Sequence, residues 1–223
     1  PPSQTTPTAQ PILQVKNLSE DGIVRAISFK VYKGEVLGLF GLMGSGRSEL
    51  ARMIFGIDKY SQGEVWLENQ KLSQSTKAAI QNKMAFVTEN RREEGLMMEA
   101  TITHNLALVS VDDFARTPLR VVDDLALVTA SKEVSSNLRV KASDITRQAA
   151  KSLSGGNQQK VVIGKWLMSK PKLFILDEPT RGVDVGAKYE IYTIIHDLAK
   201  AGNGVLMISS EVEELIGMCD HIL

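Results

Sequence analysis

The sequence has little cysteine, no long apolar run and no excess of charge of either sign. Its only cysteine is Cys219, so no disulfide can form within the 223 residues, which is typical of a reducing compartment. No apolar run approaches the ~20 residues that span a bilayer, so any connection to a membrane would come through a partner. Lys+Arg and Asp+Glu both number 26, which disfavours binding to nucleic acid mainly through bulk positive charge. The composition, 43% hydrophobic and 23% charged, is that of an ordinary globular domain.

The two ends differ from the rest of the chain. Four of the seven prolines lie among residues 1–11, PPSQTTPTAQP, a stretch that cannot bury apolar surface and is predicted to be an extended linker. The sequence stops at Leu223, where an apolar strand is expected to begin. We therefore expect a fragment of a longer polypeptide, with a single domain over residues 12–223. The alternative is a short disordered leader on a complete protein.

The hydrophobic pattern predicts an α/β fold. Short apolar runs bounded by glycine and turn residues predict strands, and stretches of helical periodicity lie between the later ones. The strands are expected at 12–15, 26–31, 35–40, 64–67, 84–87, 173–176 and 204–208, and helices at 48–55, 157–168 and 186–201. Residues from about 91 to 150 contain amphipathic stretches and no convincing strand, so we expect a helical insertion there. Alternation of strands and helices indicates a parallel sheet with both faces covered.

A glycine-rich stretch between a predicted strand and a predicted helix is a candidate phosphate-binding loop. Its glycines would let backbone N–H groups surround phosphate oxygens at a helix N-terminus, and a serine hydroxyl would hold Mg²⁺. The stretch covers residues 41–48, Gly-Leu-Met-Gly-Ser-Gly-Arg-Ser, with Arg47 where such loops normally have lysine. Its candidate nucleotide-binding residues are Gly41, Gly44, Ser45, Gly46, Arg47 and Ser48. Taken alone, it fits a plain strand-to-helix turn equally well.

Two carboxylates follow the predicted strand 173–176. Asp177 is placed to reach the Mg²⁺ shell, and Glu178 to polarise an attacking water. The alternative is an acidic strand end before the turn at Pro179. Two carboxylates directly behind four apolar residues, downstream of a candidate phosphate loop, favour the metal-binding interpretation.

A third motif, Leu-Ser-Gly-Gly-Asn-Gln-Gln-Lys, begins at Leu153. Ser154, Gly155 and Gly156 would stand at a helix N-terminus and offer hydrogen-bond donors to an anion. Here the chain resembles the ABC (ATP-binding cassette) ATPases, whose signature motif this is, and all motifs occur in that family's order over residues 12–223. The resemblance implies an ABC-type P-loop NTPase with a RecA-like parallel sheet core, an N-terminal antiparallel β-subdomain and an inserted α-helical subdomain. It also implies ATP and Mg²⁺ as ligands, and a signature that contacts the γ-phosphate bound by the opposite cassette of a dimer.

The motif details narrow the resemblance. The phosphate loop, the segment Val87–Leu96, Asn157 and the segment Thr180–Lys188 look like the second cassette of a double-cassette ATPase that powers bacterial monosaccharide import of the ribose, galactose and xylose type. This implies several partners: an upstream cassette of the same polypeptide, integral membrane permease subunits and, indirectly, a periplasmic sugar-binding protein. It also implies a peripheral location on the cytoplasmic face of the inner membrane. Nucleic acid is not expected as a partner.

Some positions depart from the pattern of a working cassette. Arg47 replaces the loop lysine, Glu89 stands where the family has a glutamine, and Ser210 where it has a switch histidine. No aromatic residue lies within 19–23, where most cassettes stack a ring on adenine. The other residues of the motifs remain, namely Ser48, Asp177, Glu178 and Asp184. We therefore expect nucleotide and Mg²⁺ to bind while hydrolysis is slow or absent.

Two alternatives remain open, and one segment has a plainer interpretation. The site could turn over normally with arginine in the loop, or the chain could be a non-catalytic regulatory module of the same complex. A soluble ABC protein acting on ribosomes or DNA is disfavoured by the neutral charge. Residues 90–94, Asn-Arg-Arg-Glu-Glu, are predicted to be a solvated loop, although the resemblance implies that a helix of the membrane subunit docks nearby.

Overall fold

The computed structural model describes residues 10–42, 44–115 and 121–223. The chain forms two compact units. The core unit contains the chain up to Glu89 together with Pro171–Pro179 and Tyr192–Leu223, and the helical unit contains Asn90–Lys170 and Thr180–Ile191. Most of the expected linker, residues 1–9, lies outside the described residues, and the first strand already begins at Pro11.

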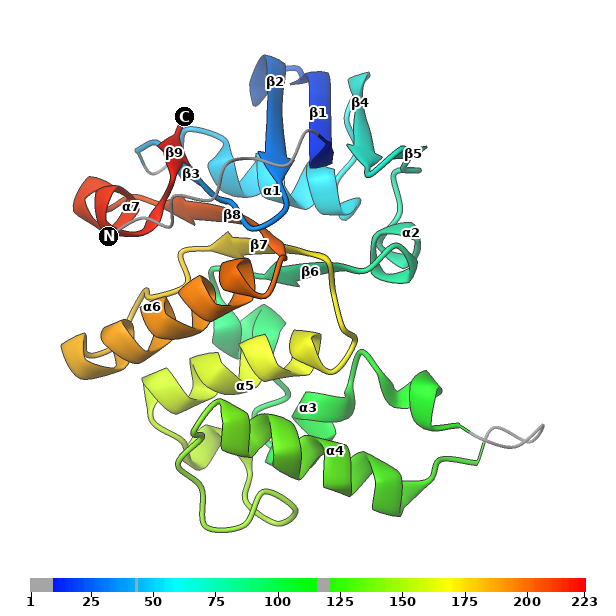
Figure 1. The fold of residues 1–223 in the computed structure, drawn as a ribbon, viewed down its shortest axis with the longest axis vertical. Helices are drawn as coiled ribbons and strands as arrows, with labels where there is room; N and C mark the ends of the chain where they lie inside the picture. The colour runs from blue at the N-terminus through cyan, green and yellow to red at the C-terminus, as the bar shows by residue number, and fades with distance from the viewer. Residues whose placement is uncertain (1–9, 43, 116–120) are drawn as a thin grey trace. The chain divides into compact units, whose positions relative to one another are not determined.

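The core unit contains two sheets, whose strands are labelled in Figure 1. The antiparallel sheet has the order β2-β1-β4-β5, and the five-stranded parallel sheet has the order β6-β7-β8-β3-β9. The strands are β1 (Pro11–Glu20), β2 (Val24–Tyr32), β3 (Val36–Phe40), β4 (Gln62–Leu67), β5 (Gln70–Lys71), β6 (Met84–Val87), β7 (Leu173–Asp177), β8 (Gly204–Ser209) and β9 (His221–Ile222). The helices α1 (Arg47–Phe55), α2 (Thr76–Gln81) and α7 (Val212–Met218) also belong to this unit. The predicted pairing of a parallel core with an N-terminal antiparallel sheet is confirmed.

The central strands explain why the sequence shows unbroken apolar runs. Every residue of β7 and β8 is buried, because both strands have a parallel neighbour on each side and covered faces. The strand β5, of two residues, is too short to leave a pattern that the sequence alone could reveal, whereas the strand expected at the end of the sequence is present as β9.

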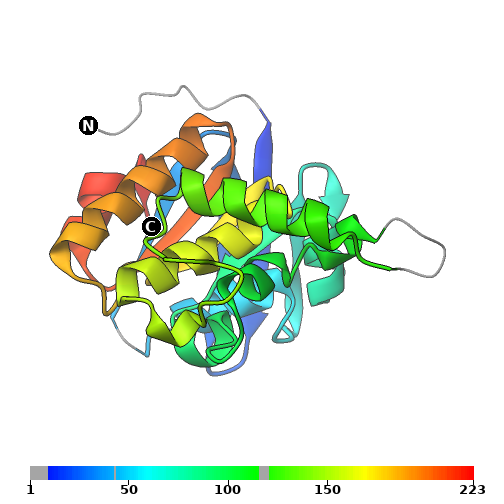
Figure 2. The same ribbon diagram turned by 90° about the horizontal axis from the view of Figure 1, so that it is seen from below.

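The helical unit is built around α5 (Gly155–Leu167), which packs against α3 (Ile102–Ala107) and α4 (Asp124–Asn137). In Figures 1 and 2, α4 and α5 lie side by side. The unit also contains the π-helix η1 (Arg91–Gly95), the 3-10 turns η2 (Val111–Phe114) and η3 (Ala150–Ser152), and the first turns of α6 (Val185–Lys200). The helix α6 crosses from the helical unit to the core unit after Ile191.

The unit differs in extent from the predicted helical subdomain, 91–150. It also includes α5, which packs on α3, α4 and η1, and the segment Thr180–Ile191. At the end of the expected helical insertion, residues 145–153 form turns and the short η3 instead of an α-helix. Within the three ranges that the structure describes, no helix has the length and apolar character needed to cross a membrane.

Candidate functional site

The residues predicted for catalysis lie at the carboxyl edge of the parallel sheet. β3 leads into the glycine-rich loop, β7 ends at Asp177, and β8 ends directly before Ser210. These three strands are neighbours, with Asp177 opposite Ile208 and Phe40 opposite Ser209 in the register. This edge is where open α/β sheets bind ligands, since the loops that follow adjacent parallel strands meet there.

The glycine-rich loop has the backbone that only glycine adopts without strain. Gly44 and Gly46 have φ values of 81° and 86°, and Gly46 is the residue before the first turn of α1. A Cβ at Gly46 would lie 2.8 Å from the carbonyl oxygen of Ile23, and one at Gly41 would lie 2.6 Å from Oγ of Ser45. A side chain at either position would therefore displace its neighbours, so the sequence forms a tight turn that presents the N-terminus of α1.

Ser48 and Asp177, the predicted metal ligands, are hydrogen-bonded to each other. Asp177 is 2% exposed, and its Oδ1 is buried without a hydrogen-bond partner among the described residues. The pKa of Asp177 is raised to about 6, mainly by burial and also by the nearby Glu178, against the Ser48 hydroxyl and the charge of Arg47, which lower it. A buried carboxylate oxygen with no partner beside a hydroxyl is the donor set that suits Mg²⁺.

The side chain of Arg47 forms an ion pair with that of Glu178. Nη2 of Arg47 is 3.4 Å from Oε1 of Glu178, and both side chains are about nine-tenths buried. The Nη1 atom of Arg47 is buried and has no hydrogen-bond partner in the described part of the chain. An anion placed at the loop would satisfy this donor, so the residues present fit a phosphate group.

Ser210 contacts the same carboxylate through its backbone. Its N–H donates to Oε1 of Glu178 at 2.8 Å, while the N–H of Glu178 donates to the carbonyl of Ile208. This contact uses the main chain of Ser210, whereas a histidine at this position would use its ring. Glu178 is thus held from two sides, by Arg47 and by the Ser210 amide.

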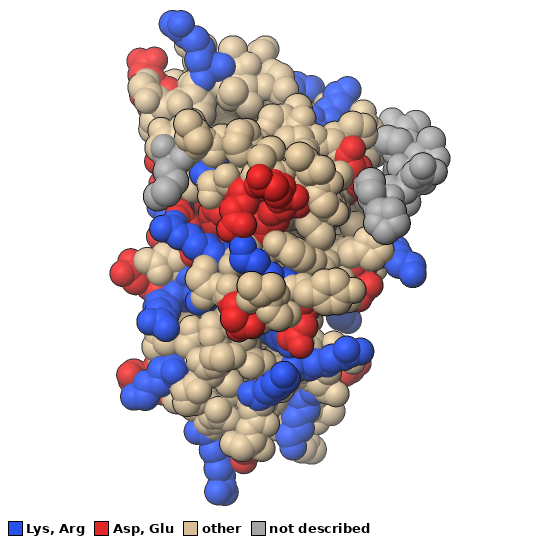
Figure 3. All heavy atoms as spheres, turned by 90° about the vertical axis from the view of Figure 1, so that its left-hand side faces the viewer, with Lys and Arg blue, Asp and Glu red and all other residues tan. Residues whose placement is uncertain are grey.

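The surroundings of Ser210 are acidic. Ser209, the last residue of β8, donates from its hydroxyl to buried Glu214, and the first turn of α7 also carries Glu213. α7 lies on the left of Figure 1, and acidic side chains gather on the face that Figure 3 shows from that side. No cationic side chain of α7 stands in for the missing histidine.

Glu89 is the last residue of the core unit, two positions beyond the end of β6. β6 pairs in parallel with β7, so Glu89 lies at the same carboxyl edge as Asp177. It is half-buried and has an interaction partner.

A cavity of about 550 Å³ borders the hairpin between β1 and β2. It is lined by residues 19–26 and Gln62, with no aromatic ring among them. Ile23, which is 42% exposed, packs its carbonyl over Gly46 of the glycine-rich loop. The cavity therefore adjoins the loop and is of a size that admits a nucleotide base, with polar and aliphatic rather than aromatic walls.

The remaining predicted site residues belong to the helical unit. Ser154 is the residue before the first turn of α5, is exposed, and makes no capping bond to the helix with its side chain. The first N–H groups of α5 therefore lack intrahelical partners, as at any helix start. Asp184 accepts a hydrogen bond from the N–H of Ala187 at 3.0 Å and so caps α6. A Cβ at Gly156 would overlap that of Ala187, so the starts of α5 and α6 pack at the closest possible approach.

The sequence reasoning missed two residues near this surface. Arg91, placed in a solvated loop, instead forms part of η1 and is half-buried with hydrogen bonds to two backbone carbonyls. Lys160, three residues after Asn157, is 2% exposed and pairs with Glu190 at 2.7 Å. The sequence offers one indication that Lys160 is buried: it is a charged residue on the apolar side of a helix.

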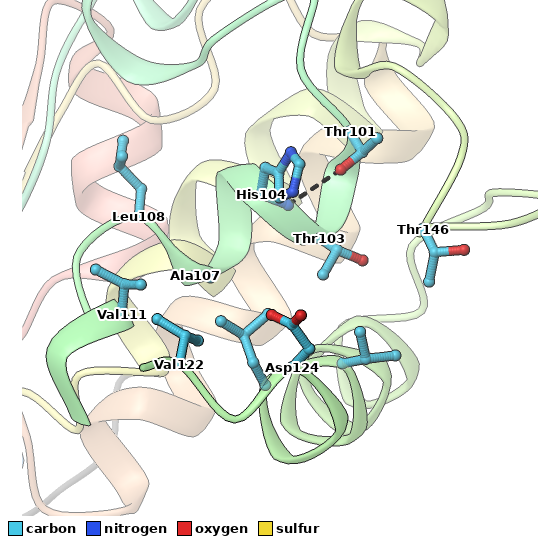
Figure 4. Close-up of a pocket in the computed structure, with 11 residues that line it drawn as sticks. Thr101, Thr103, His104, Ala107, Leu108, Val111, Val122, Asp124 and Thr146 are labelled. Carbon is cyan, nitrogen blue, oxygen red and sulfur yellow. Dashed lines mark hydrogen bonds between the residues drawn. The ribbon is translucent and has the colours of Figure 1, made fainter. Parts of the chain in front are cut away.

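The helical unit contains a second cavity, of about 510 Å³, among α3, η2 and α4 (Figure 4). Its lining is mainly aliphatic, with His104 and Asp124 as its ionisable residues. The N–H of His104 donates to the hydroxyl of Thr101, which caps α3. In the part of the chain that the structure describes, His104 belongs to no group of potential ligands that could hold a metal ion.

Comparison with known proteins places this arrangement in a family. The ribose import ATP-binding protein of Lacticaseibacillus paracasei is 46% identical over 97% of this chain and 43% of its own length, and the galactose/methyl galactoside import ATP-binding protein of Photobacterium profundum is 42% identical over 97% of this chain and 44% of its own length. The chain thus spans less than half the length of these relatives. The crystal structure of an ATP-binding cassette of an ABC transporter in its ADP conformation superimposes with a TM-score of 0.80, at 25% identity, over 96% of this chain and 87% of that one. The ABC transporter family model matches residues 24–181, and the chain belongs to that family.

Proposed function

We propose that this chain is the ATP-binding cassette of an importer for monosaccharides of the ribose and galactose type, and that it binds ATP with Mg²⁺ at the glycine-rich loop. One observation carries the nucleotide site: Arg47 Nη1 and Asp177 Oδ1 are a buried donor and a buried acceptor without hydrogen-bond partners among the described residues. A phosphate oxygen at the first and a cation at the second would satisfy both. The sugar class rests on the names of relatives that are 41–46% identical to this chain.

The residues have distinct roles in this proposal. The loop glycines let backbone N–H groups face the phosphates, and Ser48 with Asp177 would hold Mg²⁺, which neutralises charge on the phosphate oxygens when bound. Glu89 and Glu178 are the groups that would orient a water. Calorimetry with Mg-ATP tests the site directly: we expect weak saturable binding, because the base cavity lacks an aromatic ring, and no saturable heat at millimolar Mg-ATP would refute it.

The pairing of Arg47 with Glu178 supports slow hydrolysis at this loop. A carboxylate polarises water through its negative charge, and a guanidinium 3.4 Å away reduces that charge. The same arginine is the residue that would contact the phosphates, so it is shared between two anionic partners. This also favours the second candidate, a regulatory cassette that binds nucleotide without turnover.

The signature surface is proposed to serve the opposite cassette. Ser154, Gly155 and Gly156 retain the motif, and the start of α5 offers N–H donors to an anion. The relatives are about twice as long as this chain, which leaves room in them for a second cassette. The proposed partners are therefore an upstream cassette, membrane permease subunits and, indirectly, a periplasmic sugar-binding protein, with the chain at the cytoplasmic face of the inner membrane.

The test compares two kinds of variant in the complete transporter. Ser154→Ala removes a hydroxyl donor and adds no atom that could collide with a neighbour. Gly156→Asp adds a negative charge, and its Cβ would also overlap that of Ala187. Loss of a donor aimed at developing charge costs roughly 10²–10³ in rate in a well-studied hydrolase. Glu178→Gln should cost far less, since it disables a loop that is already slow. If Glu178→Gln is the most damaging of the three to ATP hydrolysis, the chain is an ordinary hydrolytic cassette.

A further inference from the structure

The guanidinium of Arg91 holds the loop that leads into α6. Its Nη1 donates to the carbonyl of Arg181 at 2.6 Å, and its Nη2 donates to the carbonyl of Gly182 at 3.0 Å. All three residues belong to the helical unit. Arginine presents two donors in a fixed fork, whereas lysine is a single point charge. Arg91 therefore fixes two successive carbonyls of the loop, and Asp184 follows two residues later.

The same guanidinium also borders the start of α5. A Cβ built at Gly155 would lie 2.9 Å from Nη2 of Arg91 and 3.0 Å from the carbonyl oxygen of Gly182. The signature backbone, the loop carbonyl and the arginine thus meet at one point with no space for a side chain. A side chain at position 155 would therefore displace the Arg91 guanidinium and press on the loop carbonyl, independently of any contact with a phosphate.

Two further contacts join α5 to the first turns of α6. Gly156 packs directly on Ala187, where any Cβ would overlap. One turn along, Nζ of Lys160 binds Oε2 of Glu190 at 2.7 Å and donates to the carbonyl of Arg139 at 3.0 Å. Lys160 is 2% exposed, so this ion pair is shielded from solvent on the lysine side. These contacts explain why Thr180–Ile191 belongs to the helical unit although the rest of α6 does not.

We infer that Arg91 is a positioning residue, which locks the loop before Asp184 onto the start of α5 so that Ser154, the first α5 amides and Asp184 form one preformed surface. The use of that surface rests on the function proposed above, in which it receives the nucleotide held by the opposite cassette. Preformed donors need no reorganisation when charge develops, whereas a loose loop would have to be ordered at that moment. Arg91 itself need not touch the nucleotide.

The inference is tested in the complete transporter with Arg91→Gln, Arg91→Lys and the control Arg147→Gln, whose side chain is 89% exposed in the same unit. We expect Arg91→Gln to lower kcat for ATP hydrolysis by at least about tenfold. KM for ATP should not change, because no group of the glycine-rich loops is altered. Arg91→Lys keeps one of the two donors and should recover part of the loss. Arg147→Gln should leave kcat unchanged within about twofold.

Amide hydrogen exchange gives a second readout that a general loss of folding would not reproduce. In Arg91→Gln the amides of residues 180–184 should exchange faster than in the wild type, while those of β7 and β8 should not change. If the exchange rates of residues 180–184 are unchanged, the inference is wrong, even where kcat is lowered. If Arg91→Gln assembles poorly, the same exchange measurement is made on Arg91→Lys.

Ser154→Ala, measured in parallel, separates the inference from the proposed function. If Ser154→Ala slows hydrolysis and Arg91→Gln does not, the positioning role is wrong and the function proposed for the signature stands. If neither variant slows hydrolysis, the trans role of this surface fails, and Arg91 has no catalytic effect to transmit.

Discussion

Asp177 should make the free energy of unfolding depend on pH in an unusual direction for an aspartate. Burial raises its pKa from 3.8 to about 6 in the folded state, so the folded chain binds this proton more tightly than the unfolded chain does. Stability contributed by the protonated group is therefore present at low pH and is lost as pH rises from about 4 to about 6. Each pKa unit corresponds to about 1.36 kcal/mol, so the ionised Asp177 costs the nucleotide-free chain about 3 kcal/mol at neutral pH.

The variant Asp177→Asn keeps the size of the side chain and cannot ionise. We expect its free energy of unfolding at pH 7 to exceed that of the wild type by about 2 kcal/mol, less than the full cost because Arg47 loses a favourable neighbour. Near pH 4 the two proteins should be equally stable. The assay is urea unfolding over a pH series, with chelator present and nucleotide absent, and with unchanged m-values as evidence of comparable unfolding.

Mg-nucleotide should reverse that order. A ligand that binds only the folded state stabilises it in proportion to the logarithm of its concentration above Kd, and Asp177→Asn removes a proposed Mg²⁺ ligand. With saturating Mg-ATP the wild type should therefore become the more stable protein. Asp197→Asn, an exposed aspartate of the core unit, is the control and should change neither profile. A wild-type profile that is flat between about pH 4 and pH 6, or an Asn variant no more stable at pH 7, would refute the reasoning.

Three other changes have defined outcomes. The ammonium of Lys165 donates to the carbonyl of Gly95, and burial lowers its pKa to about 8. The folded state therefore binds this proton less tightly than the unfolded chain does. The free energy of unfolding should rise between about pH 8 and pH 10. Lys165→Met should abolish that rise in urea unfolding. Gly164→Val should lower the free energy of unfolding by about 2 kcal/mol in the same assay, because a Cβ there would lie 2.7 Å from a leucine methyl group of α3. A variant as stable as the wild type would show instead that α3 can shift to make room for the side chain. Arg47→Lys combined with Ser210→His should raise hydrolysis at this loop, measured with the other cassette inactivated, and a wild-type loop that already matches the other cassette contradicts this.

The sequence by itself determined the elements and the motifs. The runs at 173–176 and 204–208 are apolar throughout because β7 and β8 are buried on both faces, and such runs are readable without a structure. The glycine-rich loop was readable because Gly44 and Gly46 need positive φ values in a strand-to-helix turn. The ABC fold followed from the order of these motifs, and the fold is confirmed by the family match and the solved cassettes.

Only the tertiary structure decided which groups meet. Arg91 and the carbonyls it binds are 90 and 91 residues apart, and the Ser210 amide is 32 residues from Glu178. Periodicity reports which face of a local element is apolar, but a bond from one side chain to a distant main-chain carbonyl leaves no periodic trace. The same holds for the strand order, in which β3 lies between β8 and β9, and for the division of α6 between two units. These features arise from packing between segments that are far apart in the sequence, and local sequence patterns do not reveal which distant segments pack together.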